Sequence, residues 1–67
     1  MAAWQQDIQR NQTVWTEQLG NGVILDIDWV FKTVLVDFYE KGHETFEFDD
    51  LIGNFDEGLN QWVITTI

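Results

Sequence analysis

Apolar and polar residues alternate along residues 22–29, which is the clearest periodicity in the chain. A period of two is typical of a strand with one buried face, because successive side chains point to opposite sides. We therefore predict a strand here. Its odd positions form the buried face and its even positions form the outer face: Val23, Leu25, Ile27 and Trp29 are buried, and Ile24, Asp26 and Asp28 are outside.

The same period recurs twice and predicts strands over residues 34–40 and 44–48. The expected buried residues are Val34, Val36, Phe38, Phe46 and Phe48, and the expected outer residues are Leu35, Asp37, Tyr39, Thr45 and Glu47. Strand-forming residues also dominate 13–18 and 60–66. The segments "LGNG" and "EKGH" favour turns, because glycine and asparagine tolerate positive φ, and "VFKT" is the expected hairpin loop.

Two segments lack this period. Residues 49–55 place apolar side chains where one helical turn could pack over the end of the strands, with Asp49 or Asp50 as its cap. Residues 1–12 are rich in glutamine, and Trp4 and Ile8 share one helical face. This start is either a short helix docked through those two residues or a frayed arm.

The fold expected from these elements is mainly β. A meander of five short strands exposes its edges unless it curls and closes. We therefore predict a small five-stranded antiparallel barrel of SH3 type over residues 13–67, as a single domain, with residues 1–12 as an arm or short helix and one helical turn near 49–55.

The amino-acid composition limits the classes of partner that the protein can bind. The chain of 67 residues has a net charge of −9, and its only bases are Arg10, Lys32 and Lys41. Nucleic-acid binders and anionic membrane surfaces both require basic residues, so we expect neither direct nucleic-acid binding nor membrane binding. The charge favours a basic protein partner, or it serves solubility alone.

Candidate chemistry is sparse, and we expect a protein that is not an enzyme. The chain has no cysteine, and His43 is its single histidine, so no transition-metal site is expected. No phosphate-binding or nucleophile motif is present, and no cofactor is expected. Without a secretory signal or a long apolar run, the expected location is the cytoplasm.

The acidic residues of the central strands are the candidate binding site. The predicted parity puts Asp26, Asp28, Asp37 and Glu47 on the outer face, interleaved with Leu35 and Tyr39. Strands lie about 4.8 Å apart, so these carboxylates should form a compact field. We interpret this face as a docking surface on which apolar residues anchor a partner and carboxylates select a basic one. The alternative is that the carboxylates lie apart, are screened by solvent and have no role in docking.

The stretch "LGNGVILDID" followed by "TVLVDFYEKGHETFEFDDL" resembles the Tudor-like and KOW-like small barrels over residues 19–52. Such domains occur in superfamily 1 DNA repair helicases and in CarD-like transcription regulators. The resemblance implies a non-catalytic adaptor of the transcription or repair machinery. The chain departs from the nucleic-acid-binding members by its lack of bases. It departs from methyl-lysine readers because Trp29 and Tyr39, two of the possible cage residues beside Phe31, fall on opposite predicted faces.

Two functions follow from these observations. The first is a small adaptor or regulatory module that docks on a basic surface of a larger protein. The second is a nucleic-acid mimic, either a phage-like antagonist or a bacterial immunity protein, that blocks a DNA- or RNA-binding protein. A homodimer is also expected if residues 60–67 form an unpaired edge.

Overall fold

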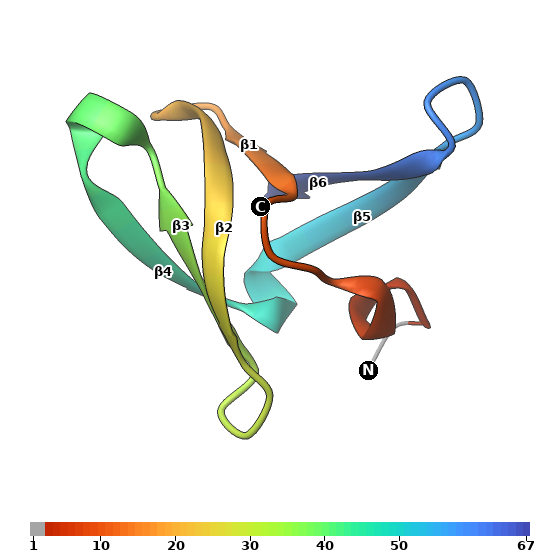
Figure 1. Ribbon diagram of the computed structural model, residues 1–67, viewed down its shortest axis with the longest axis horizontal. Coiled ribbons are helices and arrows are strands. Elements are labelled where there is room, and N and C mark those ends of the chain that lie inside the picture. Colours follow the sequence, from red (N-terminus) through yellow and green to blue (C-terminus); the bar gives the residue numbers. More distant parts are fainter. Residues whose placement is uncertain (1–2) are drawn as a thin grey trace.

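The computed structural model describes residues 3–67, which form one bent sheet and three single 3₁₀ turns (Figure 1). The strands are β1 (Thr13–Thr16), β2 (Gly20–Asp28), β3 (Thr33–Asp37), β4 (His43–Glu47), β5 (Leu51–Asp56) and β6 (Gln61–Thr66). The turns are η1 (Ala3–Asp7), η2 (Tyr39–Lys41) and η3 (Phe48–Asp50). The spatial order of the strands is β4-β3-β2-β1-β6-β5.

The protein is mainly β, as predicted, but the predicted five-stranded antiparallel barrel is wrong. The sheet has six strands and is mixed, because β1 runs parallel to β6 with Val14 opposite Ile64. It does not close, because β4 and β5 lie at its two ends. In Figure 1, β2, β3 and β4 form one limb of the bent sheet, β5 and β6 form the other, and β1 joins them.

The helical turn predicted for residues 49–55 is also wrong. The structure has instead a 3₁₀ turn, η3, over Phe48–Asp50. Its N-cap residue is Glu47, and neither Asp49 nor Asp50 caps it. The following residues form β5, an antiparallel hairpin with β6. The hairpin turn is made by Asp56, whose side chain accepts the Leu59 N–H at 3.1 Å, and by Asn60 at a φ of 54°. The sequence "DEGLN" is therefore the connection between two strands.

Residues 60–67 do not form an unpaired edge, so the condition under which we expected a homodimer through this segment is not met. Strand β6 pairs with β5 along its whole length and with β1 at Ile64 and Thr65. It is an interior strand, and the second edge of the sheet is β5.

A β-bulge at Leu25 reverses the predicted facing of the first half of β2. Ile24 lies opposite Val36 and Asp26 lies opposite Leu35, so Leu25 is the extra residue. Ile24 is consequently fully buried, and Leu25 is 40% exposed. Beyond the bulge the predicted parity is restored, and Ile27 faces inward while Asp26 and Asp28 face outward.

The core lies on the inner face of the bend and draws on every strand except β4, and on η3. Its buried apolar residues are Ile8, Val14, Ile24, Val34, Val36, Phe38, Phe48, Leu51 and Ile64. The predicted burial of Val34, Val36, Phe38 and Phe48 is confirmed, while Phe46 is half-buried.

The start of the chain is docked on this core. Ile8 is buried, Trp4 packs against the cluster, and the Gln5 side chain donates to the Phe48 carbonyl at 3.2 Å. The predicted docking through Trp4 and Ile8 is thus confirmed, with a 3₁₀ turn in place of an α-helix. Residues 1–2 of the predicted arm lie outside the described residues.

Candidate functional site

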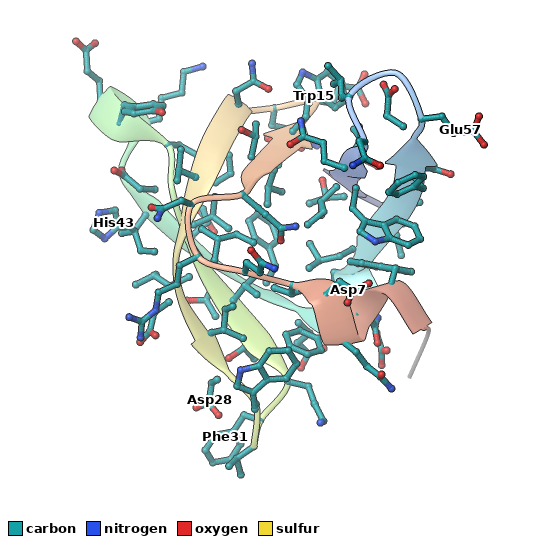
Figure 2. The ribbon with its side chains drawn as sticks, turned by 45° about the vertical axis from the view of Figure 1, so that its right-hand side comes forward. Asp7, Trp15, Asp28, Phe31, His43 and Glu57 are labelled. Atoms are coloured by element: carbon teal, nitrogen blue, oxygen red, sulfur yellow. The ribbon has the colours of Figure 1, made fainter. Side chains whose placement is uncertain are left out.

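The outer face of β2, β3 and β4 carries the acidic residues, in three cross-strand rows. The registers place Asp28 beside Thr33 and Glu47, Asp26 beside Leu35 and Thr45, and Val23 beside Asp37 and His43. We call this surface the acidic face. None of its nine residues is a lysine or arginine. Four of them are carboxylates, and His43 lies at one corner of the face (Figure 2).

Five of the six residues predicted for the site lie on this face. Asp26, Asp28 and Glu47 are exposed, and Asp37 and Leu35 are half-buried. Tyr39 does not belong to the face, because β3 ends at Asp37 and Tyr39 opens η2 with a φ of 61°. Its ring is 65% exposed beside the β3–β4 connection. The prediction for Tyr39 is wrong because the alternation was extended past the end of the strand.

The cross-strand register keeps the carboxylates apart. Within the described sheet, no aspartate or glutamate of the acidic face lies directly opposite another. Asp28 and Glu47 share a row, but Thr33 separates them, which leaves about two strand spacings of about 4.8 Å between their backbones. The repulsion that directly opposed like charges would create is therefore avoided.

Two of the carboxylates also have local roles in turns. Asp28 accepts the N–H groups of Val30 and Phe31 at 2.9 and 3.0 Å and so closes the β2–β3 turn. Asp37 accepts the Tyr39 N–H at 2.9 Å where the chain leaves β3. These are Asx-type turn contacts, in which a short carboxylate side chain replaces a main-chain acceptor.

Asp26 forms an ion pair with Arg10 that the sequence did not predict. The Arg10 guanidinium donates to its carboxylate at 3.0 Å, and both side chains are largely exposed. The main chain explains the approach, because Asn11 donates to the Ile24 carbonyl and Ile24 donates to the Gln12 carbonyl. No spacing in the sequence signals this pair. His43, which was interpreted only as a turn residue, lies 3.6 Å from the Asp37 carboxylate.

Apolar side chains crowd the tip of the β2–β3 hairpin, next to the Asp28 row. Val30 and Phe31 are 84% and 77% exposed, and Figure 2 shows Phe31 and Asp28 together at this end of the molecule. Trp29 is partly held by an edge-to-face contact with Phe48 at 5.6 Å between centroids. Trp29, Phe31 and Tyr39 do not form a cation cage, because Tyr39 lies on the β3–β4 connection at the other end of β3.

A groove of about 480 Å³ lies where the chain before β1 diverges from β6. It is lined mainly by amide and aromatic side chains, among them Gln9, Gln12, Trp15, Gln61 and Trp62. Of the described residues lining it, only Arg10 is charged, and that guanidinium is paired with Asp26. The groove therefore gathers no set of acids, bases or nucleophiles.

Residues 3–67 offer little other chemistry. That stretch contains no group of three or more histidine, cysteine or acidic residues arranged to hold a metal ion. Nor does it contain a helix with the length and apolar character needed to cross a bilayer.

The comparisons with known proteins give no relative. No family model, no curated protein and no solved structure matches the chain. The resemblance to Tudor-like and KOW-like barrels over residues 19–52 therefore stays a prediction.

Proposed function

We propose that the protein is a small binding module that docks through its acidic face on a basic surface of a larger protein. The observation that supports this is the composition of one continuous face. Four carboxylates stand on three adjacent strands, and among the described residues only Arg10 and His43 bring a basic side chain within 4 Å of them. Such a field speeds encounter with a basic partner and disfavours acidic ones.

Leu35 favours docking on a protein over mimicry of nucleic acid. It lies in the middle row of the face, between Asp26 and Thr45, and it is half-buried. Nucleic acids present a dense, regular line of phosphates. The acidic face presents separated carboxylates around an apolar centre, which is the arrangement of a protein interface with a desolvated core and a polar rim.

Octa-arginine is a suitable probe, with binding followed by NMR chemical shifts. The triple variant D26N/D37N/E47Q removes three charges from the face and retains side-chain oxygens for the Ile27 and Tyr39 N–H groups. We expect about tenfold weaker binding than for a control of equal net charge. Three exposed ion pairs of about 0.5 kcal/mol each give about 1.5 kcal/mol, which is about a factor of ten.

The matched control is E17Q/D56N/E57Q, which removes three charges outside the face. Figure 2 shows Glu57 on the far side of the molecule from His43. The control should bind nearly as well as the unmodified protein, and the largest chemical shifts should fall on β2, β3 and β4. Equal losses in the two triple variants would mean that only net charge matters, and the docking proposal would be abandoned.

A further inference from the structure

The outer face of the other limb of the sheet carries a single charged residue, Asp56, which lies beside Gln61 in the last row of the β5–β6 hairpin. Trp15 lies beside Thr65, which lies beside Ile52, and Val63 lies beside Asn54 in the next row. We call the outward residues that precede this last row the neutral face: Thr13, Trp15, Ile52, Asn54, Val63 and Thr65. Trp15 is 46% exposed and Ile52 is 42% exposed. The molecule thus presents one acidic and one neutral outer surface.

Strand β5 borders the neutral face and has a neighbour on one side only among the described residues. The Ile67 N–H donates to the Asp50 carbonyl at 3.0 Å, and the register of β5 and β6 continues from there without a shift. Bonded pairs alternate in an antiparallel ladder, so Ile52 and Asn54 face β6 with their main-chain groups. Gly53 and Phe55 therefore direct N–H and C=O groups to the open edge.

The two edges of the sheet differ in charge. Strand β4 carries Glu44 and Glu47, and charged residues on an edge strand oppose pairing with another chain. Strand β5 has no charged residue between Leu51 and Phe55. The Trp4 ring lies over Gly53 in the direction of its missing Cβ, which is the inner face, so Trp4 covers the face of β5 and not its edge.

We propose that β5 pairs antiparallel with β5 of a second copy of this chain, so that the two neutral faces become one surface. Two identical segments that pair antiparallel are related by a two-fold axis, which closes the assembly at a dimer. A second copy fits this edge because its own β5 presents the same open N–H and C=O groups, and two such strands are complementary when they run antiparallel. Two molecules of net charge −9 repel each other, and this limb opposes few carboxylates, since Asp56 is the one charged residue among its outward strand positions.

Salt separates this inference from the function proposed above, on which it does not rest. Ions screen the repulsion between two acidic copies, so self-association should strengthen with salt. Binding of octa-arginine to the acidic face should weaken under the same change.

Sedimentation equilibrium tests the dimer, with Ile52→Lys as the disruptive variant and Leu25→Lys as its control. Both replace a large apolar side chain of almost equal exposure with the same charge, but Leu25 lies at the bulge of the acidic limb. In about 500 mM NaCl we expect I52K to associate at least tenfold more weakly than L25K. The unmodified protein should associate at least tenfold more tightly than in about 50 mM NaCl.

Three results would overturn the proposal: a monomer at about 1 mM protein in high salt, weaker association at higher salt, or equal association of I52K and L25K. If I52K does not fold, Asn54→Lys on the same exposed face takes its place. Binding of octa-arginine to the acidic face should be unchanged in I52K and in N54K, the two variants of the neutral face.

Amide hydrogen exchange identifies the contact itself. The Gly53 and Phe55 amides should exchange at least several-fold more slowly in the dimer than in the monomer, because pairing gives them acceptors. A dimer that leaves both exchange rates unchanged would show that the copies meet elsewhere, and the strand-pairing proposal would fall.

Discussion

Gly53 lies where β5 passes beneath the ring of Trp4, and a Cβ atom at this position would overlap the indole. Trp4 in turn stacks near Trp62 with ring centroids 6.3 Å apart, and Trp62 meets Phe55 edge-to-face at 5.4 Å. We expect Gly53→Ala to lower the free energy of unfolding by about 1–3 kcal/mol, because the indole must shift out of a packed position. Urea denaturation followed by tryptophan fluorescence measures this loss.

Gly58→Ala is the control for that measurement. Its Cβ would meet only the Asp56 side chain, at 3.2 Å, in an exposed turn. It should change stability by no more than about 0.5 kcal/mol. If the two alanine variants are equally stable, the close approach of Trp4 to Gly53 is not a constraint on the fold.

The sequence shows that Gly53 interrupts the apolar pattern of residues 49–55, but it does not show why a glycine is needed there. Glycine there was interpreted as punctuation after a helical turn, whereas the structure requires it for contact with a residue from the far end of the chain. The pair of Arg10 and Asp26 escaped prediction for the same reason, because it depends on how segment 9–12 crosses β2. Local periodicity carries no information on such contacts.

At the scale of elements, the β2–β3 hairpin depends on Asp28. Its carboxylate closes the turn through two N–H groups. Asp28→Ala should cost about 0.5–2 kcal/mol, the range found when a capping side chain is lost. Asp28→Asn keeps an acceptor oxygen and should retain most of the stability. Thermal unfolding of the two variants distinguishes them, and an equal loss in both would assign the effect to charge instead of to the turn.

The period of two predicted β3, β4 and the buried parity of Val34 and Val36 correctly, because these strands are regular. Phe38 is buried as predicted, although it follows the end of β3. The period of two failed in β2 because Leu25 is a bulge, and an extra residue reverses the parity on one side of it. The acidic face was still placed correctly, since Asp26 and Asp28 both follow the bulge. Residues 51–56 escaped prediction because Leu51 and Ile52 are apolar neighbours and Gly53 follows them, so the segment shows no period of two.

For the whole molecule, the excess of acids makes stability depend on salt. Repulsion among the exposed carboxylates is screened over about 10 Å at 0.1 M salt and about 3 Å at 1 M. We expect the Tm of I52K, chosen because it should stay monomeric, to rise by about 4–8 °C from about 50 to about 500 mM NaCl. This range corresponds to about 1 kcal/mol for a domain of this size.

The variant D26N/D37N/E47Q is the control for this dependence, because it carries three fewer charges. Its Tm should rise by less over the same range of salt. A Tm that does not respond to salt in either protein would mean that the spacing of the carboxylates has already removed their mutual repulsion.

Strand β6 is the sole neighbour of β5 within the described sheet, and it also contacts β1. During synthesis on the ribosome, the first four strands therefore emerge as a meander whose inner surface is not yet covered by β5 and β6. Neither β5 nor the parallel contact with β1 can form until residues 61–66 have left the exit tunnel. Folding of this domain is thus coupled to the synthesis of residues 61–66, and a nascent chain stalled before that point would expose Val14, Ile24 and Val36 to chaperones.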